Sequence, residues 1–207
     1  MPRTIIGRTV FLNKYVNRGI FAVVFSMAVF LSAVSEARPA DLGLKLLAGW
    51  AHAGVESKMP PPIDRLGFGI GFEAWIFRGL GVEADLVYSR KGYHVTWETE
   101  DHDFAEISFP VLLKARFFLD GASTLSLSIF GGGAYSLFLT EMDPDFRQHD
   151  WGIIAGASLE KRLGGIGLLL EGRYHWGLLY QSDEYMPGRF SFKTRTFYLL
   201  AGVRFPL

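Results

Sequence analysis

The sequence predicts an all-β protein, an eight-stranded antiparallel up-and-down transmembrane β-barrel that follows an N-terminal signal peptide. Three observations support this prediction. Apolar residues alternate with small or polar ones in eight segments, and the connections between these segments alternate between short and long. The composition is rich in glycine (24 residues) and phenylalanine (18), with only 20% charged residues. Such a mixture favours β structure over a helical globular fold.

Residues 1–37 have the three-part pattern of a secretory signal peptide. An apolar run from Ile20 to Val34 is followed by Ser35-Glu36-Ala37, which offers small residues for cleavage. The segment before the run is basic and has no acidic residue; its charges are Arg3, Arg8, Lys14 and Arg18. Fifteen helical residues span about 22 Å, short of the roughly 30 Å of a hydrocarbon core. We therefore expect cleavage near Ala37 and a barrel domain at 38–207.

Alternation with period two marks the strands, because successive side chains of a strand point to opposite faces. Between Leu66 and Phe77, for example, one face carries Phe68, Phe72 and Ala74 and the other carries glycines and Glu73. The other expected strands are Leu42–His52, Leu80–Tyr88, Glu106–Phe117, Leu125–Leu139, Asp150–Glu160, Ile166–Trp176 and Arg195–Phe205.

The connections alternate in length, as in an up-and-down barrel. Tight glycine-containing turns are expected at Arg78-Gly79, Asp120-Gly121 and Leu163-Gly164-Gly165. Longer polar loops are expected at 53–64, 90–103, 141–149 and 181–191. Short turns at one rim and long loops at the other are typical of outer-membrane barrels with an even number of strands.

The apolar face is expected to contact lipid, although a soluble eight-stranded barrel would also alternate. The polar face is dominated by Gly, Ser and Ala, which suit a narrow interior, whereas the apolar face carries side chains too large to fit there. Aromatic residues near strand ends are placed as an interfacial girdle requires: Tyr88, Phe117, Trp151, Trp176 and Phe205. These features predict a location in the outer membrane.

Eleven charged residues are predicted to lie inside the barrel. They are Lys45, Glu73, Glu83, Asp85, Glu106, Lys114, Arg116, Glu160, Glu171, Arg173 and Arg204. Because isolated buried charges are very costly, this nearly balanced set predicts a network of ion pairs across strands. An ion path or a catalytic cluster is the alternative, but eight strands leave no continuous channel.

Several motifs together resemble the PorT-like outer-membrane β-barrel family. Tyr88-Ser89-Arg90-Lys91-Gly92 follows an acidic strand, Phe109–Lys114 carries a hydrophobic-Pro-hydrophobic run that ends in lysine, and Arg173-Tyr174 precedes Gly177. The resemblance covers nearly all of residues 42–207. It departs from the family pattern at Ile107-Ser108-Phe109-Pro110 and at the terminal Phe205-Pro206-Leu207. The resemblance implies an outer-membrane barrel without an assigned activity, although one branch of the family is associated with protein secretion.

Motifs for chemistry are weak. A loop cluster of histidines and acids has no metal-binding spacing; it comprises His94, Asp101, His102, Asp103 and His149. Gly131-Gly132-Gly133 lacks the Lys-Ser/Thr of a phosphate loop. His175 and Glu171 share one face but are separated by about 13 Å along the strand. No catalytic residue, cofactor or metal is therefore predicted.

The expected function is that of a non-enzymatic outer-membrane barrel whose long loops contact another envelope or surface component. Aromatic residues among charges in the expected loops would suit such contact: Tyr93, Trp97, Phe146 and Tyr185. The zero formal net charge gives no reason to expect nucleic acid as a partner. The alternative is a membrane-embedded hydrolase or lipid-modifying enzyme, since such enzymes also occur on barrels.

Overall fold

The computed structural model describes residues 41–55, 63–77, 79–94, 101–139, 149–179, 181–183 and 190–207. All of these belong to one compact unit, Ala40–Leu207. The predicted signal peptide at 1–37 lies outside the described residues. Among the residues that the structure describes, no helix is long and apolar enough to cross a membrane.

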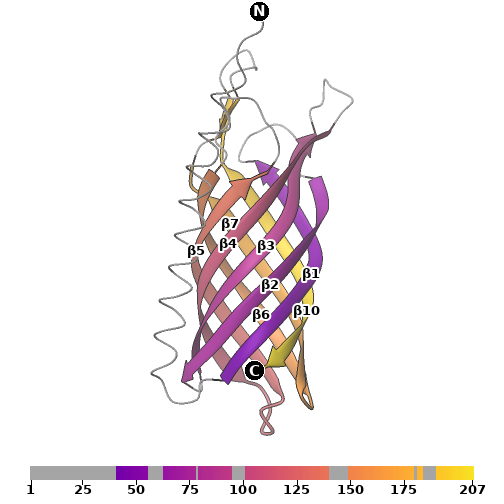
Figure 1. The fold of residues 1–207 in the computed structure, drawn as a ribbon, viewed down its shortest axis with the longest axis vertical. Coiled ribbons are helices and arrows are strands. Elements are labelled where there is room, and N and C mark those ends of the chain that lie inside the picture. Colours follow the sequence, from indigo (N-terminus) through magenta and orange to yellow (C-terminus); the bar gives the residue numbers. More distant parts are fainter. Residues whose placement is uncertain are drawn as a thin grey trace, which may run out of the picture. The chain divides into compact units, whose positions relative to one another are not determined.

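The unit is a closed barrel of eight antiparallel strands, as predicted (Figure 1). Around the barrel the strand order is β1-β10-β7-β6-β5-β4-β3-β2, so each strand pairs with its sequence neighbours in the barrel and β10 closes onto β1. The strands are β1 (Asp41–Val55), β2 (Ile63–Phe77), β3 (Leu80–His94), β4 (Asp101–Phe118), β5 (Leu125–Phe138), β6 (His149–Leu163), β7 (Ile166–Gly177) and β10 (Thr194–Pro206).

All four expected long loops overlap strands, which corrects the prediction; the loop at 141–149 does so only at His149, where β6 begins. Strand β3 continues to His94 and β4 begins at Asp101, within the expected loop 90–103. Likewise β1 runs to Val55 and β2 starts at Ile63. The expected loop 181–191 contains β8 (Gln181–Asp183) and most of β9 (Phe190–Phe192), which pair as a separate two-stranded sheet.

The tight turns lie where the sequence predicts them. Leu163 and Ile166 are paired across Gly164-Gly165, and Gly164 has a φ of 61°. A two-residue turn with a positive φ at its first central position is the type II′ hairpin turn, for which glycine is preferred at that position. The three tight turns and the chain end at Leu207 lie at one rim of the barrel, which we call the turn end; the opposite rim is the loop end (Figure 1).

Exposure alternates along the strands, so one face of the wall points outward and the other into the barrel. On β7 the outward Leu168 and Leu170 are exposed, whereas Leu169 between them and Glu171 and Arg173 beyond them are buried. Of the predicted girdle residues, Trp176 is half-buried with its ring 4.3 Å from that of Tyr174. The other four, Tyr88, Phe117, Trp151 and Phe205, are exposed on the outer wall.

Alternation fails at one place, near the end of β2. The register between β2 and β3 shifts between Trp75 and Phe77, which is the mark of a β-bulge or similar irregularity. Around it Ala74 and Trp75 are both buried, whereas Ile76 and Phe77 are both exposed. Ala74 pairs with Leu42 and Val82 of the outward set and lies between the inward Glu73 and Trp75, so it keeps its predicted outward side although its side chain is buried.

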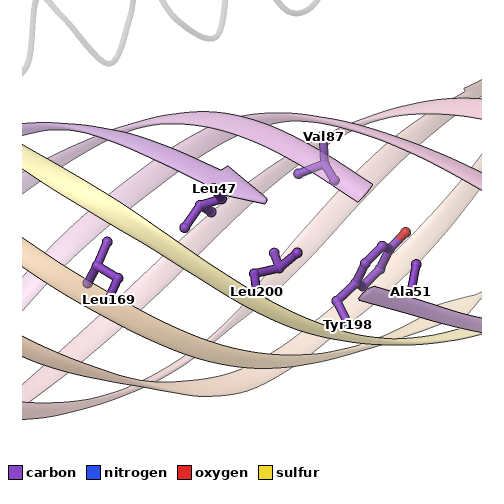
Figure 2. Packing of buried hydrophobic residues seen from close by; sticks show 6 residues of the cluster. All are labelled: Leu47, Ala51, Val87, Leu169, Tyr198 and Leu200. Carbon is purple, nitrogen blue, oxygen red and sulfur yellow. The ribbon is translucent and has the colours of Figure 1, made fainter. Parts of the chain in front are cut away.

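Apolar side chains also pack inside the barrel, in two clusters. Figure 2 shows the first, in which Leu47 of β1, Val87 of β3 and Leu200 of β10 point inward. Its other members are Ala51, Leu169 and Tyr198, and the second cluster comprises Leu112, Phe130, Ala134 and Ile154. We call the two clusters together the apolar layer. The interior therefore combines apolar packing with charge.

Candidate functional site

The charged interior is the most distinctive feature of the barrel. All eleven residues predicted to face inward are buried, with exposed fractions of 6% or less. Ten of them belong to one connected set of ion pairs, which we call the large network, and Glu106 belongs to a second set near the loop end. The alternation of the sequence orients these side chains, since residues two apart on a strand share a face.

Glu83 on β3 lies at the centre of the large network. Its carboxylate accepts from Lys45 Nζ at 2.6 Å and from Lys114 Nζ at 2.5 Å. Arg173 Nη2 is 3.0 Å from the same carboxylate. Three cations from three other strands thus converge on one fully buried acid, an arrangement that satisfies the charge where water is excluded.

The cations around Glu83 each bind a further acid, so the network is continuous. Lys45 Nζ also donates to Glu171 at 3.1 Å, and Lys114 Nζ donates to Glu73 at 3.1 Å. Arg173 contacts Glu171 and lies 2.6 Å from Asp85. Because each cation is shared between at least two carboxylates, removal of one residue would affect several partners.

Three arginines close the turn end of the network around Asp41. Arg204 Nη2 donates to the Asp41 carboxylate at 2.7 Å, Arg162 Nη2 at 3.1 Å and Arg116 Nη1 at 3.4 Å. The Arg116 guanidinium also stacks on the Trp75 ring, 3.5 Å from its centroid. A planar guanidinium can do both, because it donates in its plane and stacks through its face.

The loop-end cluster is smaller and consists of Lys91, Glu106, Ser136 and His175. Lys91 Nζ lies 2.7 Å from the Glu106 carboxylate, which also accepts from Ser136 Oγ at 3.0 Å. The His175 Nδ1 atom is 3.5 Å from Lys91 Nζ. Nearby, Ser89 and Tyr198 share a hydrogen bond of 3.1 Å between their hydroxyls.

Uncharged inward residues separate the two sets of ion pairs on most strands. On β3, Val87 and Ser89 lie between Asp85 and Lys91. On β4, the buried Ser108, Pro110 and Leu112 lie between Glu106 and Lys114. On β7, by contrast, Arg173 and His175 are direct inward neighbours. Along β3 and β4 uncharged residues therefore lie between the two sets of ion pairs, whereas along β7 the two sets adjoin.

Asp150, at the start of β6, holds residues on both sides of a long connection. Its Oδ1 accepts from the backbone N–H of Leu179 at 3.0 Å, and its Oδ2 accepts from Thr194 Oγ1 at 2.9 Å. The Asp150 side chain is fully buried. Each oxygen of the carboxylate thus accepts a hydrogen bond from a different end of the connection.

Sequence reasoning missed four residues of this interior: Asp41, Lys91, Asp150 and Arg162. Lys91 falls in the expected loop 90–103, although it lies an even number of residues from Glu83 and Asp85 and so shares their face of β3. Asp150 and Glu160 are an even number of residues apart on β6 and so lie on the same face, as do Asp41 and Lys45 on β1. The signal that could have found them was the same alternation, extended beyond the apolar segments.

The expected histidine cluster gives no metal site within the described side chains. Those of His94, Asp101, His102 and Asp103 lie outside them, and His149 stacks against Tyr135 with ring centroids 6.3 Å apart. In the part of the chain that is described, no three His, Cys, Asp or Glu residues are arranged to hold a metal.

Comparison with known proteins identifies the fold. No protein-family model and no curated protein sequence matches the chain. Among solved structures, Neisserial surface protein A (NspA) superposes with a TM-score of 0.57 at 16% identity, covering 82% of this chain and all of that one. The outer membrane protein OprG from Pseudomonas aeruginosa has a TM-score of 0.50 at 12% identity, covering 81% of this chain and 98% of its own.

These likenesses, together with the apolar outer wall and charged interior, define the class of protein. The chain is a small eight-stranded β-barrel of the bacterial outer membrane. At this level of identity the similarity concerns the fold. The resemblance to the PorT-like family stays a prediction.

Proposed function

We propose that this protein is a non-enzymatic, non-conducting barrel of the outer membrane that presents its long loops to another envelope component. The observation that carries the proposal is the filled interior. The large network occupies the turn end, and the inward Leu47, Leu112 and Leu200 lie in the apolar layer beyond it. An eight-stranded barrel has room only for packed side chains, and the charged network and the apolar layer provide them in this barrel.

The first test measures conduction. The purified protein in planar bilayers is expected to show no stable ion current, because packed interior side chains leave an eight-stranded barrel no continuous channel. Truncating the apolar layer in a Leu112→Ala, Leu200→Ala double variant provides a matched control, which should leak more than the wild type. Steady single-channel steps from the wild-type protein would instead favour a pore.

The second test concerns the partner. A photo-cross-linking amino acid placed at Trp97 or Phe146, both in the long connections outside the described residues, is expected to capture a protein in intact cells. The same group at Leu113, which is exposed on the outer wall, is the matched control and should react with lipid. The PorT-like resemblance favours an envelope protein of a secretion or assembly system as the partner. Equal capture at both kinds of position would contradict the proposal.

One observation favours the enzyme alternative. His52 and Asp64 face outward on neighbouring strands β1 and β2, with Nδ1 and Oδ1 only 2.6 Å apart. A carboxylate that orients an imidazole in this way is one part of a general-base site. If the purified protein released fatty acid from phospholipid or lipopolysaccharide vesicles, and His52→Gln abolished the release, a hydrolase would become the better assignment.

A further inference from the structure

The connection between β7 and β10 is tied down at both of its ends by one side chain. Leu179 lies just after β7 and Thr194 begins β10, and the Asp150 carboxylate accepts a hydrogen bond from each. The backbone adds a third contact at the same place, because the N–H of Leu178 donates to the carbonyl of Trp151 at 2.7 Å. The segment between these two ends carries the β8–β9 sheet.

The contact between Asp150 and Thr194 reaches across an intervening strand. In the barrel, β6 pairs with β7 and β7 pairs with β10, so β6 and β10 are not neighbours. Gly177 of β7 lies between the two side chains: a Cβ built there would collide with both Thr194 Oγ1 and Asp150 Oδ2. The missing side chain of Gly177 therefore provides the space in which the hydroxyl meets the carboxylate.

None of these side-chain contacts is needed to build the strand ladders. Backbone hydrogen bonds of β6, β7 and β10 depend on register and not on the carboxylate of Asp150. The β8–β9 sheet, in contrast, has only three residues in each strand. A two-stranded ribbon of this length is at best marginally stable by itself in water, so its position depends on how its ends are held.

We propose that Asp150 is a positioning residue that fixes both ends of the β7–β10 connection and thereby holds the β8–β9 sheet in one place at the loop end. Any role of that sheet in binding a partner rests on the proposed function. The clamp, by which we mean the two hydrogen bonds from Leu179 and Thr194 to Asp150, does not. Hydrogen bonds to an ionised carboxylate are about twice as strong as neutral ones, which suits this role.

Hydrogen–deuterium exchange of the full-length protein in lipid vesicles tests the clamp. In Asp150→Ala, Thr194→Val and Gly177→Ala, the amides of 181–183 and 190–192 are expected to exchange at least about tenfold faster than in the wild type. Amides in the middle of β4 and β5 are expected to keep their protection. Thr194→Ser retains the hydroxyl and should restore slow exchange.

Ser136→Ala is the matched control, because it removes a buried hydrogen bond to Glu106 at the same end of the barrel without touching the clamp. It should leave exchange at 181–183 and 190–192 unchanged. Should Asp150→Ala fail to fold, Thr194→Val and Gly177→Ala still break the contact while Asp150 stays in place.

Two results would overturn the clamp: unchanged exchange of β8 and β9 in the three variants, or an equal increase in the barrel strands, which would mean a general loss of stability. The outcome is separable from that of the proposed function. Faster exchange in the variants, together with no cross-linking from the loops, would support the clamp and contradict the proposed partner. Cross-linking from the loops together with unchanged exchange would support the partner and contradict the clamp.

Discussion

Lys114 shows what a single buried cation contributes to this barrel. It lies between the carboxylates of Glu83 and Glu73, at 2.5 and 3.1 Å, with 2% of its side chain exposed. Replacing Lys114 with Met removes one of the cations bound to each of these carboxylates and leaves the large network with one more carboxylate than it has cations. The expected loss in the free energy of unfolding is about 3–5 kcal/mol, the range for breaking a fully buried ion pair. Urea unfolding in lipid vesicles measures it.

A double change separates charge from packing. If the cost comes from the stranded carboxylate, Lys114→Met combined with Glu83→Gln should lose less than the sum of the two single changes. Lys161→Met, which removes an exposed lysine, should change stability by no more than about 0.5 kcal/mol. Additive single and double variants would contradict the network interpretation.

Asp120 makes the turn between β4 and β5 sensitive to acid. A hydrogen bond from the Thr124 hydroxyl, helped by the backbone N–H groups of Leu125 and Thr124, lowers the pKa of Asp120 below its usual 3.8. The ionised form therefore stabilises the folded turn above about pH 4, and this contribution is lost as the pH falls through the lowered pKa.

Asp120→Ala should accordingly reduce stability at pH 7 and differ less from the wild type below pH 3.8. Equilibrium unfolding across this pH range checks the prediction. Gly121→Ala, in the same turn, has open space around the added methyl group and changes no titratable residue, so its pH dependence should follow the wild type. A constant difference between Asp120→Ala and wild type would count against the assignment.

At the scale of residues, the alternation of the sequence predicted which side chains face inward but not which of them form ion pairs with one another. The tilt of the strands decides the partners: Glu83 and Glu171 come from distant parts of the chain and share Lys45. Lys91 was not predicted to face inward because it lies beyond the apolar alternation of its strand. Asp150 begins an expected strand beside the outward Trp151, so the alternation did place it on the inner face, but it was not included among the charged interior residues.

Among the elements, β5 depends on a glycine that faces inward. A Cβ added at Gly132 would collide with the backbone carbonyl of Val111 on β4, whereas one added at Gly133 would point outward and lie 3.9 Å from its nearest neighbour. Gly132→Ala should therefore destabilise the barrel by about 1–3 kcal/mol, as overpacking does.

Gly133→Ala is the matched control, one residue along the same strand, and should cost less than about 1 kcal/mol. The measurement is again the free energy of unfolding in lipid vesicles. Equal effects of the two changes would mean that close approach of β4 and β5 is not what Gly132 serves. This close approach accounts for Gly132 within the glycine run, whereas an added Cβ at Gly131 or Gly133 would make only ordinary contacts.

Elements were predicted well within the membrane-facing part and less well beyond it. Lipid on one side forces strict alternation, so segments such as Ile166–Trp176 nearly coincide with the strand observed. Past the rim both faces can meet water, and the constraint disappears. The ends of β3 and β4 and the β8–β9 sheet lie in this unconstrained region, and their sequences read as polar loop.

At the scale of the whole molecule, the orientation of the wall can be tested with one charge. Leu113 is an outward residue with 63% of its surface exposed, and Leu113→Arg should cost about 2–4 kcal/mol in lipid if it lies near the midplane. Leu139→Arg, exposed just beyond the loop end of β5, should cost no more than about 1 kcal/mol. Equal costs would favour a water-facing wall.

The N-terminal prediction concerns the molecule before it reaches the membrane. If 1–37 is a signal peptide, protein purified from outer membranes should begin at or near Arg38, because a peptidase reads the small residues before that position. Mass spectrometry of the intact protein measures this. A mature membrane form that retains Met1 or Pro2 would contradict the assignment of a cleaved segment.

The seam between β1 and β10 has a kinetic consequence. It joins strands from opposite ends of the barrel sequence, and the ion pair between Asp41 and Arg204 closes a loop of 163 residues. Until β10 pairs with β1, the sheet has two open edges, whose backbone groups hydrocarbon cannot satisfy. Closure is therefore a late and entropically expensive event. Once formed, the seam must be lost as a unit, so spontaneous unfolding from the membrane should be very slow.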